Sequence, residues 1–140
     1  MLSVQNLEVV YQDVILVLRG VSFEIPKGKI VSLLGSNGSG KTTVIRSITG
    51  LLDIQNGDIT KGSITVDGED ITNLNPSKIV EKGIAQVLEG RRIFSELTVI
   101  ENLRLGGHTN SKDVPQNIDR VLDLFPILNC LLYTSDAADE

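Results

Sequence analysis

A glycine-rich stretch at residues 35–43 carries residue types that bind a polyphosphate. It runs Gly-Ser-Asn-Gly-Ser-Gly-Lys-Thr-Thr and matches the phosphate-binding loop pattern in full. Glycines let the backbone curl so that successive N–H groups point inward toward an anion. Lys41 can then reach the β- and γ-phosphates, and the Thr42 hydroxyl is placed to ligate magnesium. The pattern predicts a site for a nucleoside triphosphate, with contacts from Gly35, Ser36, Asn37, Gly38, Ser39, Gly40, Lys41, Thr42 and Thr43.

Strand and helix patterns flank this loop in the order that a phosphate-binding loop requires. Residues 30–34 form a short apolar run, typical of a strand that is buried on both faces. A helix that begins near Lys41 would turn its unpaired N–H groups and positive dipole end toward the same anion. Apolar residues recur at helical spacing after the loop, namely Val44, Ile45, Ile48, Leu51 and Leu52.

The composition is that of an ordinary globular protein. The chain has 140 residues, of which 41% are hydrophobic and 22% charged, enough for one domain with a core. Its net charge of −5 argues against a general nucleic-acid-binding protein, because phosphate backbones are bound by clustered lysines and arginines. The single cysteine, Cys130, excludes an internal disulfide and a cysteine-based zinc site. No segment is typical of a signal peptide or membrane span, so we expect any membrane association to go through a partner.

Five further stretches have strand patterns. Residues 2–11 and 14–25 are rich in β-branched residues and partly alternate between polar and apolar side chains. Residues 64–66 and 69–71 flank Asp67-Gly68, which is a strong signal for a tight hairpin turn. Residues 84–88 form the fifth stretch. The hairpin predicts an antiparallel patch beside a nucleotide-binding core.

Three helix starts are indicated, two of them by capping residues. Asn75-Pro76 combines a cap with a first-turn proline, and this helix should end near residue 83. Thr98 and Glu101 form a capping box for a short helix that extends to about Leu105. A last helix begins near Pro115, with one apolar face made of Ile118, Val121, Leu122 and Phe125.

These features together resemble the ATP-binding subunit of ABC transporters, in particular the subfamily that imports branched-chain amino acids. Residues 18–23, 68–72 and 89–103 carry the likeness, which spans about residues 2–128. The resemblance implies an α/β fold, a P-loop NTPase core with an antiparallel β subdomain. It also implies ATP and Mg²⁺ as cofactors. We expect the fold to be incomplete at the C-terminus.

The resemblance also implies site residues outside the loop. Tyr11 occupies the position of an aromatic residue that stacks on adenine, and the alternative is a strand tyrosine half-buried in the sheet. Glu89 occupies the position of a glutamine that touches the magnesium shell, and a carboxylate can also bind magnesium or its water. Glu89 is thus a candidate metal ligand and, with Lys41, a candidate catalytic residue. Gln86 is the alternative for this position, although we expect it to be a strand residue that points to solvent.

Three more polar residues are candidates for a functional role, two because of the same likeness and one because it is the only histidine. Arg91 and Arg92 lie in the segment that faces the coupling helix of the membrane subunit in the family, and a solvated loop pair is the equal alternative. His108 is the only histidine and lies in Gly-Gly-His-Thr. We expect it to be a loop residue without a metal.

The function implied by the resemblance is ATP hydrolysis coupled to import. The expected partners are integral membrane permease subunits, a second ATP-binding subunit and, indirectly, a periplasmic binding protein. The expected location is peripheral, on the cytoplasmic face of the plasma membrane of a bacterium or archaeon. No nucleic-acid partner is expected.

Several family motifs do not occur in the sequence. These are the Leu-Ser-Gly-Gly-Gln signature, the second magnesium motif, the catalytic glutamate and the switch histidine. We therefore expect residues 1–129 to be the N-terminal part of the ATP-binding domain, inactive in hydrolysis as it stands. Residues 130–140 resemble a translated sequencing adapter. Residues 30–34 should then lose ladder partners and expose apolar surface, which favours aggregation.

Three alternatives remain open from the sequence. A soluble ABC protein of translation or repair usually carries a second cassette or long coiled-coil insertions, and neither pattern occurs here. A phosphate-loop kinase of small molecules generally begins with the loop strand, whereas about thirty β-rich residues precede this loop. The third alternative is a product that binds nucleotide weakly or does not fold.

Overall fold

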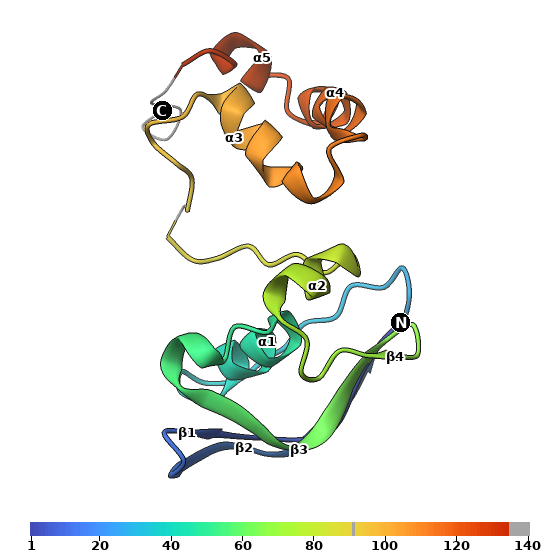
Figure 1. Cartoon of the computed structure of the whole chain (residues 1–140), viewed down its shortest axis with the longest axis vertical. Helices are drawn as coiled ribbons and strands as arrows, with labels where there is room; N and C mark the ends of the chain where they lie inside the picture. Colours follow the sequence, from blue (N-terminus) through green and yellow to red (C-terminus); the bar gives the residue numbers. More distant parts are fainter. Residues whose placement is uncertain (91, 135–140) are drawn as a thin grey trace. The chain divides into compact units, whose positions relative to one another are not determined.

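A computed structural model describes residues 1–90 and 92–134. The chain divides into two compact units, Met1–Gln86 and Val87–Glu140 (Figure 1). The first is an antiparallel sheet with helices, and the second is helical in its described part. No helix in these described ranges is both long enough and apolar enough to cross a membrane.

One sheet of four strands forms the base of the first unit. The strands are β1 (Leu2–Tyr11), β2 (Ile15–Ile25), β3 (Gly57–Val66) and β4 (Glu69–Asp70). They pair in the order β2-β1-β3-β4, and every pairing is antiparallel. The predicted strands at residues 2–11 and 14–25 are therefore confirmed.

The predicted hairpin between β3 and β4 is also confirmed. Val66 lies opposite Glu69, which leaves Asp67 and Gly68 as the two turn residues. Both have positive φ, 48° and 87°, as the mirror-image turns of tight hairpins require. Aspartate tolerates this backbone region better than most residues do, and glycine enters it without steric cost.

A short helix, α1 (Lys41–Thr49), lies over one face of the sheet (Figure 1). Its side chain Val44 and the following Leu52 are buried together with six side chains from the sheet and its edge. These six are Val4, Leu7, Val9, Leu18, Ile64 and Ile71. A second helix, α2 (Pro76–Glu81), buries Ile79, which is 1% exposed. The core therefore fixes α1 to the strands on either side of it in the sequence.

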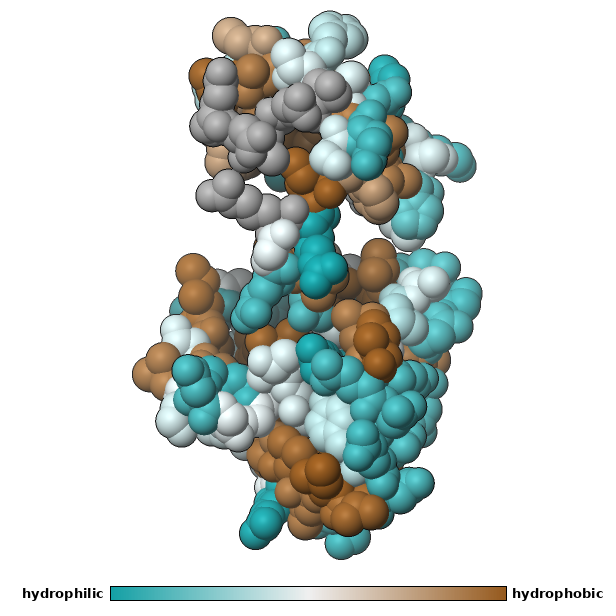
Figure 2. Space-filling view, turned by 90° about the vertical axis from the view of Figure 1, so that its left-hand side faces the viewer, coloured by the Kyte–Doolittle hydropathy of each residue, from teal (hydrophilic) through white to brown (hydrophobic). Residues whose placement is uncertain are grey.

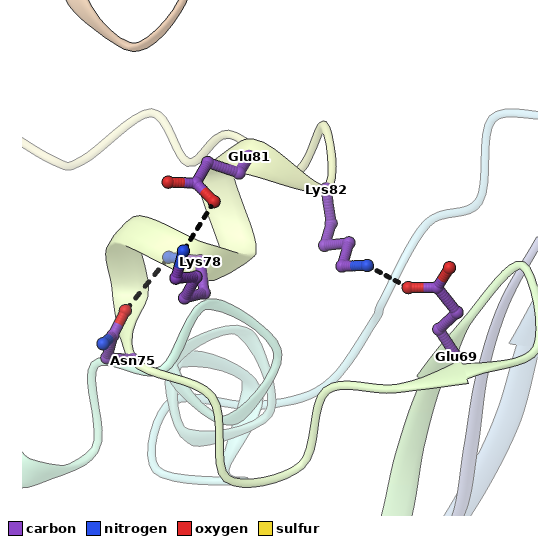
Figure 3. A network of polar contacts seen from close by, with 5 residues as sticks. All are labelled: Glu69, Asn75, Lys78, Glu81 and Lys82. Carbon is purple, nitrogen blue, oxygen red and sulfur yellow. Dashed lines mark hydrogen bonds and ion pairs between the residues drawn. The ribbon is translucent and has the colours of Figure 1, made fainter.

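Polar contacts anchor α2 at both ends (Figure 3). The Asn75 side chain accepts a hydrogen bond from the Lys78 N–H at 3.0 Å, as expected of an N-cap. The Lys78 ammonium also pairs with Glu81 at 3.1 Å within the helix. Lys82, just past the helix, forms an ion pair with Glu69 of β4. The predicted start of this helix is confirmed.

Two predicted strands are absent from the described residues. Residues 30–34 and 84–88 have no strand assignment, so both predictions are wrong for this structure. A strand needs a neighbouring strand to pair its backbone groups, and the sheet of β1 to β4 does not reach these segments. The expected exposure of apolar side chains is confirmed, since Ile30 is 100% and Leu34 is 87% exposed. Figure 2 shows apolar side chains, in brown, at the surface of the first unit.

The second unit consists of short helices. They are α3 (Val99–Gly106), η2 (His108–Asn110), α4 (Val114–Leu124) and α5 (Leu128–Leu131), η2 being a single 3₁₀ turn. The starts of α3 and α4 agree with the predicted capping box and first-turn proline. Phe125, predicted on the apolar face of α4, is its C-terminal cap and is 57% exposed.

Side-chain caps define the N-terminus of α3. The Thr98 N–H and hydroxyl donate to Glu101 at 2.9 and 2.7 Å, and the Glu101 N–H donates to the Thr98 hydroxyl oxygen at 3.4 Å. These bonds hold the pKa of Glu101 below its ordinary value of 4.5. Asn102 pairs with both backbone groups of Phe94, each at 3.0 Å, and donates to Leu97 at 3.1 Å. The loop before α3 is thus fastened to its first turn.

The segment after α5 contacts the start of α3. The N–H groups of Val99 and Ile100 donate to the carbonyls of Thr134 and Leu132, at 3.2 and 3.1 Å. Leu132 and Thr134, which belong to the predicted adapter-derived tail, therefore contact the first turn of α3. Residues 135–140 of that tail lie outside the described residues.

Loss of the capping box should weaken α3. Thr98→Ala removes the hydroxyl that both accepts from and donates to Glu101, at a cost of about 1 kcal/mol, whereas Thr98→Ser keeps it. We expect faster amide hydrogen exchange in α3 for Thr98→Ala only. Because the Glu101 pKa is lowered, its stabilising effect is present above pH 4.5 and is lost as the pH falls through the lowered value. Equal exchange in the two variants at neutral pH would contradict the role of this cap.

Candidate nucleotide-binding site

The phosphate loop curls directly into α1. Gly38 and Gly40 have φ values of 81° and 93°, and the Ser39 N–H donates to the Ser36 carbonyl at 3.2 Å. The Gly40 carbonyl then accepts the first helical hydrogen bond, from the Val44 N–H at 2.9 Å. The predicted loop–helix unit is therefore confirmed, and the N-terminus of α1 adjoins the loop.

Gly40 is the position where the loop touches the core. A Cβ there would lie 2.7 Å from the Cδ2 atom of Leu18, which is only 3% exposed, and the positive φ disfavours any side chain. At Gly38, by contrast, a Cβ would meet nothing within 4 Å. Gly40 is thus required for packing, and Gly38 leaves open space next to the backbone of the loop.

The Lys41 side chain folds back over the loop. Its ammonium donates to the carbonyls of Gly35 and Ser36, at 2.8 and 2.7 Å. A phosphate oxygen is a stronger acceptor for an ammonium than a neutral carbonyl. The geometry therefore keeps the charge of Lys41 next to the loop and lets it exchange these carbonyls for an anion.

The two threonines after Lys41 have different surroundings. Thr42 is exposed, and its hydroxyl has no hydrogen-bond partner within the described ranges. An exposed, uncommitted hydroxyl at a helix N-terminus fits a ligand of magnesium. Thr43 is 7% exposed and accepts a hydrogen bond from the Tyr11 hydroxyl at 3.4 Å. The structure therefore brings two predicted site residues, Tyr11 and Thr43, together.

Tyr11 ends β1 beside the loop helix. It pairs with Gly57 across the sheet, and a Cβ on that glycine would lie 2.5 Å from the ring. One side of the ring is thus packed against backbone, while the half-buried residue also lines a shallow groove with Thr43, Ile15 and Arg46. Packing and base stacking are both compatible with this position.

Gln86 and Glu89, the two candidates for the magnesium-shell residue, belong to different units. Gln86 is half-buried and accepts a hydrogen bond at 2.7 Å from Thr49, at the end of α1. The sequence had predicted a strand residue that points to solvent. Gln86 lies in no strand and its side chain is bound to α1, so this prediction is wrong. Glu89 is exposed in the second unit, where its carbonyl accepts from Arg92 at 3.2 Å.

The remaining predicted polar residues do not form a metal site. Arg91 lies outside the described residues, and Arg92 is exposed. His108 is exposed in η2, with Nδ1 3.1 Å from the Leu105 carbonyl. No group of three or more potential metal-ligating His, Cys, Asp or Glu side chains occurs among residues 1–90 and 92–134.

Sequence reasoning missed two polar residues near Tyr11. Arg46 lies on α1, one turn after Thr43, and its guanidinium donates to Gln55 of η1 (Asp53–Gln55). Both line the same groove as Tyr11. Arg46 could have been predicted from its i, i+3 spacing from Thr43, which places the two side chains on the same face of a helix. Gln55 lies on another element, and only the tertiary structure brings it to the groove.

The chain belongs to the ABC transporter family, whose sequence profile matches residues 18–136. It is 45% identical over 119 residues to the high-affinity branched-chain amino acid transport ATP-binding protein BraG of Pseudomonas aeruginosa, covering 84% of this chain and 49% of BraG. BraF of the same organism, with the same description, is 37% identical over 94 residues, which are 67% of this chain and 35% of BraF. The chain therefore spans half or less of the length of these curated relatives.

Solved structures agree with this assignment. A nucleotide-free ATP-binding cassette from an ABC transporter superposes with a TM-score of 0.79 at 28% identity, covering all of this chain and 59% of the cassette. Another ATP-binding cassette, in its ADP conformation, superposes with a TM-score of 0.80 at 27% identity and with the same coverage of both chains. The fold is that of part of an ABC ATPase cassette.

Substitutions at Tyr11 separate stacking from packing. Tyr11→Phe keeps the ring and loses only the bond to Thr43, so we expect nearly unchanged ATP affinity. Tyr11→Ala and Tyr11→Leu remove the aromatic face and should weaken binding by about two- to tenfold. Calorimetric titration with ATP measures this. An unchanged affinity for a folded Tyr11→Leu protein would leave only the packing role.

Proposed function

We propose that the chain is part of the ATP-binding subunit of an ABC importer for branched-chain amino acids. The observation that carries this proposal is the 45% identity to BraG over 119 residues. Family membership decides against a small-molecule kinase. A ribose import ATP-binding protein, RbsA of Bacillus subtilis, is also 38% identical over 96 residues. The solute therefore needs its own test.

The proposed chemistry is attack of water on the γ-phosphate of ATP. The N–H groups of the phosphate loop and the ammonium of Lys41 would bind the β- and γ-phosphates and stabilise the charge that develops on them. The support for this role is that Lys41 already lies over the loop with exchangeable acceptors. Tyr11, next to Thr43, would orient the adenine.

Magnesium would be held by the Thr42 hydroxyl. The exposed Thr42 side chain, uncommitted among the described residues, fits this role. When bound, the ion would neutralise part of the negative charge of the β- and γ-phosphates. The chain's own part is to present a hydroxyl at the N-terminus of α1, next to the lysine.

The proposed partners are a second ATP-binding subunit and integral membrane permease subunits, on the cytoplasmic face of the membrane. The support for these partners is the identity to BraG and BraF, both described as transport ATP-binding proteins. Arg92, exposed in the second unit, would face the permease.

Removing magnesium tests the role of Thr42. ATP should bind about tenfold more weakly in EDTA, because a charge-assisted contact is lost. In Thr42→Val this difference should shrink, while Thr42→Ser restores it. Calorimetry with and without Mg²⁺ gives both affinities. A Thr42→Val protein with the full magnesium dependence would exclude this ligand.

A chimaera tests transport. Residues 1–129 of this chain replace the corresponding part of BraG in Pseudomonas aeruginosa that lacks the native protein, and uptake of labelled leucine is measured. We expect uptake to be restored, and Lys41→Ala in the chimaera to abolish it. A membrane-associated chimaera that binds ATP but restores no leucine uptake would contradict the proposal.

A further inference from the structure

Gly57, the first residue of β3, is a glycine that its own backbone conformation does not require. It is buried, and its φ lies outside the left-handed region, so other residues could adopt the same conformation. A Cβ at this position would lie 2.5, 2.9 and 3.1 Å from the Cε1, Cδ1 and Cζ atoms of Tyr11. The ring of Tyr11 therefore occupies the space that a side chain at position 57 would fill.

The strand on which the ring lies is held in place by backbone hydrogen bonds. Tyr11 and Gly57 are paired across β1 and β3. The Gly57 N–H donates to the Leu52 carbonyl at 3.2 Å. The Gln12 N–H donates to the Asn56 carbonyl at 2.8 Å. Because β3 cannot withdraw without breaking these bonds, a side chain at position 57 would displace the ring and not the strand.

The ring also borders the shallow groove next to the phosphate loop. Among the described residues, the lining of this groove includes Tyr11, Ile15 and Thr43 but not Gly57. The Tyr11 hydroxyl donates to Thr43 at 3.4 Å, so a displaced ring would also lose this bond. A methyl group at position 57 would thus act on the groove by moving the ring.

We propose that Gly57 is a positioning residue of the nucleotide site, because its lack of a side chain lets the Tyr11 ring lie on β3 and present a face to the base of ATP. A base stacks on an aromatic ring only when a face of the ring is accessible. The inference rests on the proposed nucleotide site, with Tyr11 next to the adenine, and adds the residue that orients the ring.

The test compares ATP with inorganic tripolyphosphate, which has the phosphates but no base. Both dissociation constants are measured by calorimetry with Mg²⁺ on the full chain. Gly57→Ala should weaken the binding of ATP by about two- to tenfold, as removal of the ring does. The binding of tripolyphosphate should not change, because the phosphate loop and Lys41 are left intact.

Two controls separate the effect on the ring from general effects of the substitution. Once Tyr11→Ala has removed the ring, adding Gly57→Ala should not change the ATP affinity any further. Gly106→Ala adds a methyl group at another glycine without a left-handed φ, where a Cβ would meet nothing within 4 Å. This variant should leave both affinities unchanged.

Fluorescence observes the ring directly and does not depend on the Gly57 variant. The chain has two tyrosines and no tryptophan, so Tyr133→Phe leaves Tyr11 as the only tyrosine. ATP, but not tripolyphosphate, should then quench its emission, because only ATP brings a base to the ring. Adding Gly57→Ala should abolish this quenching.

Three results would overturn the inference and leave the phosphate site intact. The first is a folded Gly57→Ala protein with the wild-type ratio of the two dissociation constants. The second is an equal loss of affinity for ATP and tripolyphosphate, which would mean a general structural effect. The third is Tyr11 emission that bound ATP does not quench. Absence of binding of both ligands to the wild type would overturn the proposed nucleotide site as well.

Discussion

The packing of Val44 and Leu52 against the sheet holds α1, and with it the phosphate loop, on the first unit. Each buried aliphatic side chain of this kind contributes about 1.5–3 kcal/mol, so the helix is anchored by its core face. Gly40 then sits on Leu18 without room for a side chain. The loop, Tyr11 and Thr43 are consequently positioned by one small core.

Within that frame the loop has internal hydrogen bonds of its own. Lys41 donates to two loop carbonyls. When a phosphate binds, the ammonium therefore replaces these acceptors with phosphate oxygens and does not gain additional hydrogen bonds. Such exchange reduces the net gain per hydrogen bond, and it keeps the lysine close to where the anion would bind. Ligand charge, not the number of contacts, then decides the affinity.

The two ends of α1 have different connections. Its N-terminus adjoins the loop, and Thr49 at its C-terminal end donates to Gln86, the last residue of the first unit. A rigid helix of nine residues therefore links the phosphate loop to the segment that leads out of this unit. The hydrogen bond explains why Gln86 is half-buried although it belongs to no strand.

The sequence by itself determined several local conformations. The loop glycines, the Thr98–Glu101 box and the Asp67-Gly68 turn each act within four residues, so their conformations follow from nearest neighbours. Residues 30–34 and 84–88 have equally clear strand patterns but form no strand, because a ladder needs a partner strand that no local pattern supplies. Likewise, the contact of Tyr11 with Thr43 and that of Arg46 with Gln55 join residues 32 and 9 positions apart. The packing of α1 on the sheet brings Tyr11 and Thr43 together, and the position of η1 beside α1 does so for Arg46 and Gln55.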